Sequence, residues 1–207
     1  METEPKQISD EELARQARTG SLSSFEELVF RYEMRLYRLM FNRCRHEADA
    51  RELTQITFVT AYRSIHQLKP GHSFGAWLFT IAHRKFIDHC RAAKREQGEQ
   101  VAAETWETND PSIILSDRES AADLWQRARA LLSRDQFDAL WLKYQEDMSV
   151  QDIARVLGRT RTSVKVLLFR ARQNLLKEMR CADQELPCQS APLPSRRLGF
   201  QASQSAP

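Results

Sequence analysis

Basic side chains dominate the stretch from residue 155 to residue 180. It holds eight bases and one acid, Glu178, so its formal net charge is +7. The bases are Arg155, Arg159, Arg161, Lys165, Arg170, Arg172, Lys177 and Arg180. Arginine and lysine neutralise phosphates, and an arginine can also pair bidentately with guanine in the major groove. The composition therefore favours a DNA-binding surface over a merely solvated helix face.

The apolar residues around these bases predict a helix-turn-helix over 149–175. Ser149 with Asp152 gives a start like a capping box, and Ala154 is small where two helices cross closely. Gly158 supplies the positive φ of a tight turn, and Val164 plugs the second helix into the core. The N-terminal part of that second helix enters the major groove in such motifs. The residues that we expect to meet DNA are Arg159, Arg161, Lys165, Val166, Phe169 and Arg170.

A second basic segment combines charge with aromatic rings. Residues 84–95 contain five bases and one acid, and the aromatic residues Phe74, Trp77, Phe79 and Phe86 precede or join them. Charge for phosphates and flat faces for unstacked bases are what single-stranded nucleic acid requires. Aromatic residues at helical spacing are more often core residues, however, so we expect Trp77 and Phe86 to be buried.

Apolar residues at intervals of three and four predict the helices that position these groups. The predicted helices span 21–45, 49–65, 74–90, 120–132, 133–144, 149–157 and 161–179. Ser23 with Glu26, or Ser24 with Glu27, offers a capping box for the first helix. Segment 67–73 contains Pro70 and is a loop. The sequence thus predicts an all-α fold of two small helical domains, the second a helix-turn-helix.

Charge and composition also divide the chain. We expect an N-terminal polar segment over 1–20, a first domain over 21–96 and a second over 120–180. Residues 97–119 carry six acids and one base, a net charge of −5, and predict a flexible acidic linker. It would reach about 75 to 80 Å extended, or about 26 Å as a coil. Residues 181–207 are rich in Pro, Ser, Gln and Ala and are expected to be disordered.

Several classes of protein are excluded by what the sequence lacks. No apolar run has the length of a membrane span, and the N-terminus has no apolar signal region, so we expect a cytoplasmic protein. The five histidines show no metal-binding spacing, and we predict no metal, cofactor or catalytic residue. Cys44 and Cys90 are expected to be buried. For Cys181 and Cys188, unremarkable thiols are favoured over a zinc or redox role.

Four motifs in order resemble a known family. FEELVFRYEMRLYRLM (25–40) resembles the first helix of region 2 in bacterial RNA polymerase sigma factors of the extracytoplasmic-function (ECF) type. DARELTQITFVTAYRSI (49–65) resembles the family's polymerase-binding helix, and 73–91 resembles its reader of the −10 promoter element. Residues 131–175 resemble region 4, the reader of the −35 element. The resemblance covers roughly residues 10–180.

The resemblance implies roles for residues at matching positions. Polymerase-binding residues would be Asp49, Arg51, Glu52, Leu53 and Gln55. The −10 element would be bound by Leu68, Lys69, Gly71, His72, Ser73, Arg84, Lys85, Asp88 and Arg91, with the loop 68–73 holding a flipped base. The −35 element would be bound by Arg159, Arg161, Ser163, Lys165, Val166, Phe169 and Arg170. The implied partners are core RNA polymerase, promoter DNA and an anti-sigma factor.

Two other functions remain open on the sequence alone. One is a helix-turn-helix regulator whose N-terminal half senses a ligand or dimerises. The basic and aromatic segment 74–95 argues against it, because a sensor domain has no need of such a surface. The other is a DNA-processing enzyme with a helix-turn-helix tail. That enzyme would need an activated nucleophile or clustered carboxylates, and the sequence offers neither pattern.

Overall fold

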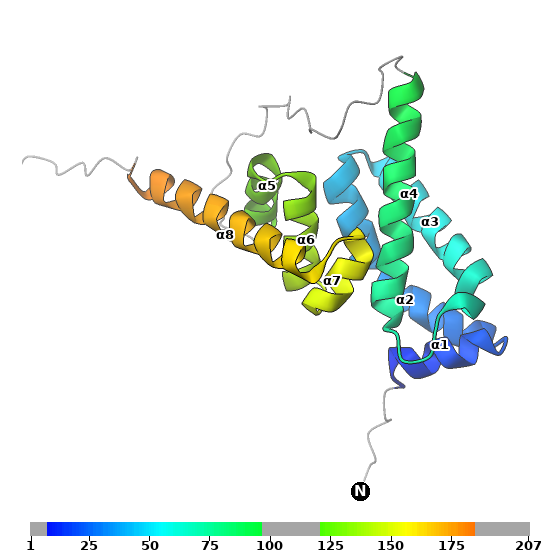
Figure 1. The fold of residues 1–207 in the computed structure, drawn as a ribbon. Helices are drawn as coiled ribbons and strands as arrows, with labels where there is room; N and C mark the ends of the chain where they lie inside the picture. The colour runs from blue at the N-terminus through cyan, green and yellow to red at the C-terminus, as the bar shows by residue number, and fades with distance from the viewer. Residues whose placement is uncertain (1–7, 97–120, 185–207) are drawn as a thin grey trace, which may run out of the picture.

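The computed structural model describes residues 8–96 and 121–184, and these residues are helical with short connections (Figure 1). The first group of helices is α1 (Asp10–Arg18), α2 (Leu22–Cys44), α3 (Glu47–Ser64), the short 3-10 helix η1 (Ile65–Gln67) and α4 (Phe74–Glu96). The second group is α5 (Ala121–Leu131), α6 (Arg134–Tyr144), α7 (Val150–Leu157) and α8 (Arg161–Gln184). The all-α prediction is confirmed. No helix in the described ranges is long and apolar enough to cross a membrane.

The first group packs around α2. Helix α2 contacts α1 and α3, and α4 lies against α3. The core holds fully buried side chains from α2, such as Leu28 and Leu36, and from α4, such as Phe79 and Phe86. Phe86 is therefore buried as expected. The connection from η1 to α4, residues 68–73, is the predicted loop.

Helix α1 is a feature that the sequence analysis did not predict. It lies within the segment that we described only as polar, and it buries Leu13, Ala14 and Ala17. Asp10 at its start accepts hydrogen bonds from Arg31 (2.8 Å) and from the hydroxyl of Tyr32 (2.6 Å), both on α2. One leucine and two alanines among nine residues give too weak a period to recognise, and the contacts to α2 stabilise the helix.

The starts of two helices differ in detail from the predicted ones. Helix α2 begins after Ser21, whose hydroxyl accepts from the backbone N–H of Ser24, so the cap is neither Ser23 nor Ser24. Helix α3 begins at Glu47 instead of Asp49, because His46 caps it by accepting from the Asp49 N–H. Helix α6 begins with a capping box, in which the side-chain oxygen of Gln136 accepts from the backbone N–H of Ser133 at 3.1 Å.

The helix-turn-helix forms as the spacing predicted. The hydroxyl of Ser149 accepts from the Asp152 N–H at 3.1 Å and starts α7. Gly158 ends α7 with φ 61°, in the left-handed region that favours glycine. Ala154 and Val164 are both buried, with Val164 at 0% exposure. Helix α8 extends to Gln184, four residues beyond the predicted end of the domain.

The two groups of helices are in contact. Helix α4 packs against α7, and the two run close together in Figure 1. The predicted acidic linker, 97–119, lies outside the described residues, as does the predicted tail from residue 185 onwards. The helices that carry the two basic segments are therefore close in the structure, since α4 contacts α7 directly.

Candidate nucleic-acid and polymerase interfaces

The N-terminal half of α8 presents an exposed basic face. Every residue predicted to read DNA from α8 is exposed: Arg161, Ser163, Lys165, Val166, Phe169 and Arg170. The side chains that hold α8 in place, Val164, Leu168 and Ala171, are buried on the opposite face. This division follows the 3.6-residue period, because 161, 165 and 169 share one face while 164, 168 and 171 share another.

Hydrogen bonds fix the start of α8. The hydroxyl of Thr160 accepts from the Ser163 N–H at 3.1 Å and caps the helix. Arg159 instead turns towards α6, where its guanidinium donates to the carboxylate of Asp135 at 2.7 Å. Phe169 and Val166 are 56% and 42% exposed and lie between the basic side chains of α8. Apolar side chains of this kind can contact a thymine methyl group. The exposed face of α8 suits binding in the major groove. Arg159 can contact DNA only after its bond to Asp135 breaks.

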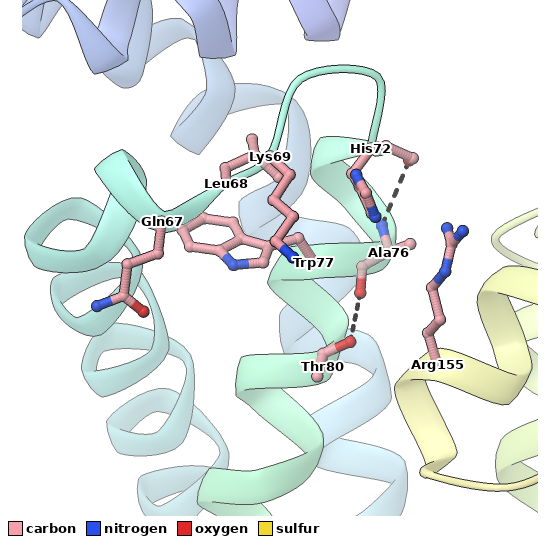
Figure 2. Close-up of a pocket in the computed structure, with 9 residues that line it drawn as sticks. Gln67, Leu68, Lys69, His72, Ala76, Trp77, Thr80 and Arg155 are labelled. Atoms are coloured by element: carbon pink, nitrogen blue, oxygen red, sulfur yellow. Dashed lines mark hydrogen bonds between the residues drawn. The ribbon is translucent and has the colours of Figure 1, made fainter.

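A pocket of about 240 Å³ lies beside the loop 68–73 (Figure 2). The loop supplies Leu68, Lys69, His72 and Ser73, all predicted for the −10 site. Sequence reasoning missed four further lining residues: Gln67, Ala76, Thr80 and, from α7, Arg155. Trp77 also lines the pocket; it is partly buried and packs against the core, so it is less buried than the sequence analysis expected. A ring with one face towards a pocket is typical of a stacking platform.

Local backbone geometry shapes this pocket. Gly71 has φ 76°, and the His72 N–H donates to the carbonyl of Lys69 at 3.2 Å, so the loop turns tightly. The Ser73 hydroxyl then accepts from the Ala76 N–H at 3.4 Å and begins α4. Nδ1 of His72 has no hydrogen-bond partner within the described ranges. The pocket thus offers an aromatic wall, a lysine and an unpaired imidazole nitrogen.

An exposed charged stripe leads away from the pocket along α4. Trp77, Thr80, Arg84, Asp88 and Arg91 follow one another at intervals of three or four, so they lie on one side of the helix. Arg84, Asp88 and Arg91 are exposed, and Lys85 beside them is half-buried. Arg91 and Asp88 approach within 3.8 Å. If a nucleobase of single-stranded DNA entered the pocket, the phosphates of the following nucleotides would lie near these basic side chains.

Helix α3 places the predicted polymerase-binding residues at different depths. Glu52 and Gln55 are exposed, and exposed Arg51 pairs with Glu47 at 2.5 Å. Half-buried Asp49 approaches His46 at 3.1 Å and His89 at 3.6 Å. Leu53 is only 4% exposed and packs into the core, so it can support the surface and does not belong to it.

The exposed face of α3 is more apolar than the sequence analysis expected. Ile56, Val59 and Tyr62 belong to the spaced apolar residues from which the helix over 49–65 is predicted, yet they are 37%, 50% and 50% exposed. Thr54 and Thr57 share the buried face of α3 with Leu53 and Phe58, and their hydroxyls donate to the helix carbonyls of Ala50 and Leu53 at 2.7 Å. With their hydroxyls satisfied, these threonines can be buried, while Ile56, Val59 and Tyr62 remain on the surface.

His83 is a buried histidine between the two groups of helices. Its Nδ1 accepts from the guanidinium of Arg43 at 3.2 Å, which requires the neutral ring. Burial, and then the positive charge of Arg43, lower the pKa of His83 to about 3. Unfolding restores an ordinary pKa, so between pH 6.5 and 3 the unfolded chain binds a proton that the folded chain does not.

Acidification should therefore reduce stability through His83. The free energy of unfolding is expected to fall by about 1 kcal/mol between pH 6.5 and pH 5.5 from this group. Urea unfolding of the wild type and of His83→Gln at both pH values measures it. The variant should lose that part of the pH dependence. If the free energy of unfolding falls by the same amount in both proteins, His83 is not the group responsible.

The cysteines and acids of the described residues show no reactive or metal-binding cluster. Cys44 and Cys90 are half-buried, and burial raises the pKa of the Cys44 thiol to about 12, so it is poorly nucleophilic. No group of three His, Cys, Asp or Glu residues that could hold a metal ion occurs in the part of the chain that the structure describes. The side chains of Cys181 and Cys188 lie outside that part.

Comparison with known proteins identifies both groups of helices. Residues 28–96 match the model of Sigma-70 region 2, and residues 123–175 match that of Sigma-70, region 4. The RNA polymerase sigma factor YlaC of Bacillus subtilis is 31% identical over 160 residues, which cover 75% of this chain and 92% of YlaC. The ECF RNA polymerase sigma factor BldN of Streptomyces coelicolor is 31% identical over 80% of this chain and 64% of BldN.

A solved structure has the same fold. CnrH, in its complex with the cytosolic domain of CnrY, superimposes with a TM-score of 0.61 at 25% sequence identity, over 84% of this chain and 99% of CnrH. The two family models match the two groups of helices described above, in the same order along the chain. The chain therefore belongs to the sigma-70 family of bacterial RNA polymerase sigma factors, in its ECF group.

Proposed function

We propose that this chain is a transcription initiation factor that binds core RNA polymerase, directs it to specific promoters and helps to melt the −10 element. The observation that carries the proposal is the presence of two nucleic-acid surfaces of different kinds. One is a basic helix face suited to duplex DNA, and the other is a pocket with an aromatic wall suited to an unpaired base.

The −35 element would be bound by α8 in the major groove. Arg161, Lys165 and Arg170 would contact phosphates or base edges, and Val166 and Phe169 would contact thymine methyl groups. Ser163, at the capped start of α8, would donate a hydrogen bond to a phosphate. Arg159 would contact DNA after its ion pair with Asp135 breaks. Base contacts supply the sequence preference, while phosphate contacts supply affinity.

The −10 element would be captured as a single strand. Flipping a base out of the duplex costs a few kcal/mol, and stacking on an aromatic ring offsets part of that cost. The pocket residues Lys69, Gly71, His72 and Ser73, with Leu68 beneath them, would hold the base beside Trp77. Arg84, Lys85 and Arg91 would attract the phosphates of the following nucleotides, with Asp88 among them.

The polymerase would bind the exposed face of α3. Asp49, Arg51, Glu52 and Gln55 would provide its charged and polar part, and Leu53 would position it from the core. We add Ile56, Val59 and Tyr62, because an exposed apolar patch rimmed by charge is typical of a protein interface. The exposed Phe30 and Met34 on α2 offer further apolar area for an anti-sigma factor.

The domain boundaries and location complete the proposal. Residues 21–96 and 120–180 would be the two binding domains, joined by the acidic segment 97–119. The factor would act in the bacterial cytoplasm and have no catalytic activity of its own, since the chemistry of RNA synthesis belongs to the polymerase. A helix-turn-helix regulator with a sensor domain is not favoured, because region 2 matches residues 28–96.

Shortening Val59 tests the α3 surface. Val59→Ala removes two methyl groups from a half-exposed side chain, and about 0.8 kcal/mol per buried CH₂ predicts roughly tenfold weaker binding to core polymerase. Titration of labelled protein with purified core enzyme measures the dissociation constant.

Ile8→Ala is the matched control for this variant. Ile8 is 46% exposed and lies before α1, away from α3 in the sequence, so its truncation should leave the affinity unchanged. If wild type fails to bind core polymerase at all, the proposed function is wrong. If Val59→Ala and wild type bind equally, the polymerase occupies another surface.

A further inference from the structure

Helix α1 is connected to the start of α4 through one buried tyrosine. Tyr32 on α2 is 5% exposed, and its hydroxyl donates to Oδ2 of Asp10, in the first turn of α1, at 2.6 Å. Burial, and then the hydrogen bond to Asp10, raise the pKa of the Tyr32 hydroxyl above its ordinary value, so the group stays protonated. The hydroxyl is therefore the donor and the carboxylate the acceptor.

The same tyrosine contacts the first turn of α4. Its ring packs edge to face on the fully buried Phe74, with 5.3 Å between the ring centroids. A Cβ atom at Gly75 would lie 2.9 Å from the Tyr32 hydroxyl oxygen and 3.1 Å from its Cε1. Only glycine, which has no side chain, lets the ring and the helix backbone approach so closely.

These contacts act on residues that shape the pocket. Phe74 and Gly75 stand in the chain between Ser73 and Trp77, which both line the pocket. The rings of Phe74 and Trp77 also contact each other, with 5.9 Å between their centroids. A shift of the Tyr32 ring would therefore move the aromatic wall of the pocket together with the backbone that begins α4.

Asp10 is itself held by α2. Nη1 of Arg31 donates to Oδ1 of Asp10 and to the carbonyl of Ile8, both at 2.8 Å, so it fixes the start of α1. Helix α1 also contacts η1 and α4, and Figure 1 shows it beside the connection that leads into α4. Asp10 thus uses one carboxylate oxygen for Arg31 and the other for Tyr32.

We propose that Asp10 and Tyr32 are positioning residues for the −10 pocket, and that α1 keeps the aromatic wall at Trp77 in place for an unpaired base. Neither residue lines the pocket, and both act through Gly75 and the first turn of α4. Binding sites loosen when the groups that support them are removed, even where every contact residue remains. The proposal rests on the proposed function for the identity of the ligand, whereas the placement of Trp77 is a property of the free chain.

Removal of the acceptor or of the hydroxyl tests the proposal in holoenzyme assembled from core polymerase and the full chain. Asp10→Ala and Tyr32→Phe should each weaken binding to fork-junction DNA with an unpaired −10 strand about tenfold, because the ring loses its hydrogen bond to α1. The affinities for paired −35 DNA and for core polymerase should not change. Glu27→Ala is the matched control, because it removes the other carboxylate that pairs with Arg31, at 2.8 Å, and leaves Tyr32 bonded.

A compensating pair of substitutions tests the route through Gly75. Gly75→Ala places a methyl group against the Tyr32 oxygen and should weaken binding to the fork junction about tenfold. When Gly75→Ala is combined with Tyr32→Phe, the oxygen that the methyl group would meet is absent. The double variant should therefore bind about as well as Tyr32→Phe alone, whereas independent effects predict a loss of about a hundredfold.

The placement of Trp77 is measured without polymerase. In the full chain labelled with 5-fluorotryptophan, the fluorine resonance of Trp77 is identified by its loss in Trp77→Phe. Asp10→Ala and Tyr32→Phe should shift or broaden this resonance, whereas Glu27→Ala should leave it in place. The resonances of the tryptophans in the second group of helices should not move in any variant. If Asp10→Ala does not fold, Tyr32→Phe carries both measurements.

The outcomes distinguish this proposal from the proposed function. If wild type binds the fork junction and Asp10→Ala and Tyr32→Phe bind it equally well, the positioning role is overturned and the proposed function stands. An unmoved Trp77 resonance in both variants overturns the role as well, as do independent effects in the double variant. If wild-type holoenzyme does not bind the fork junction, the proposed function is wrong, and the fluorine spectra decide whether α1 places Trp77.

Discussion

Replacing Arg161, Lys165 and Arg170 together by alanine is expected to weaken promoter binding by about a thousandfold. The three side chains are exposed on the N-terminal half of α8. A good base contact contributes about 1–3 kcal/mol, so the loss of three base or phosphate contacts amounts to roughly 4 kcal/mol. The measurement is the dissociation constant of reconstituted holoenzyme on a promoter whose −35 element is present.

Salt dependence shows whether phosphates are the groups contacted. Each lost phosphate contact should reduce the slope of log affinity against log salt concentration by about 0.9. Lys177→Ala is the control, because it removes one positive charge from the same helix, sixteen positions beyond Arg161, and should leave affinity and slope unchanged. An affinity and slope unchanged in the triple variant would place the −35 reader elsewhere.

Removing the aromatic wall of the pocket is expected to impair melting. Stacking of a base on an aromatic side chain is worth about 1–3 kcal/mol, so Trp77→Ala should lower the affinity for fork-junction DNA with an unpaired −10 strand about thirtyfold. The pocket at Trp77 has the volume and the mixed lining to accept one base. Binding of holoenzyme to fully paired −35 DNA should change little.

Trp77→Phe distinguishes stacking from packing. The Trp77 ring also contacts Phe74, at 5.9 Å between centroids, so its loss perturbs the domain as well. Phenylalanine retains an aromatic face, and should restore most of the affinity for the unpaired strand. If Trp77→Ala and wild type bind the fork junction alike, the base is held by another surface.

The helix-turn-helix was predictable because its signals are local. Ser149, Gly158 and Val164 act through caps, a left-handed turn and a 3.6-residue period, all visible within 16 residues. The same holds for the loop 68–73, where Pro70 and Gly71 interrupt the apolar pattern. The exposed bases of α8 follow once its buried face is known.

The surface of α3 was harder to predict because its exposed residues are apolar. Ile56, Val59 and Tyr62 obey helical spacing, and hydrophobicity alone assigns them to the core. The core face includes two polar residues, Thr54 and Thr57, whose hydroxyls donate to carbonyls of the same helix. On a binding surface of this type, apolar side chains are exposed, which is the opposite of what hydrophobicity alone predicts.

Contacts between distant segments lay beyond sequence analysis altogether. Arg43 and Asp138 resemble ordinary surface charges, and only the contact between the two groups of helices buries them together. Arg155 entered the sequence analysis only as one of the eight basic residues of 155–180, whereas in the structure it lines the pocket of the other domain. Helix α1 likewise depends on Asp10 meeting Arg31 and Tyr32 on α2.

Transcription from genomic DNA tests the central claim most directly. Core polymerase of the source bacterium, with and without the purified chain, transcribes fragments of that genome, and the 5′ ends of the RNA are mapped. The account predicts new ends at discrete positions that share one sequence near −35 and another near −10. If the added chain produces no ends beyond those of core enzyme alone, the chain is not an initiation factor.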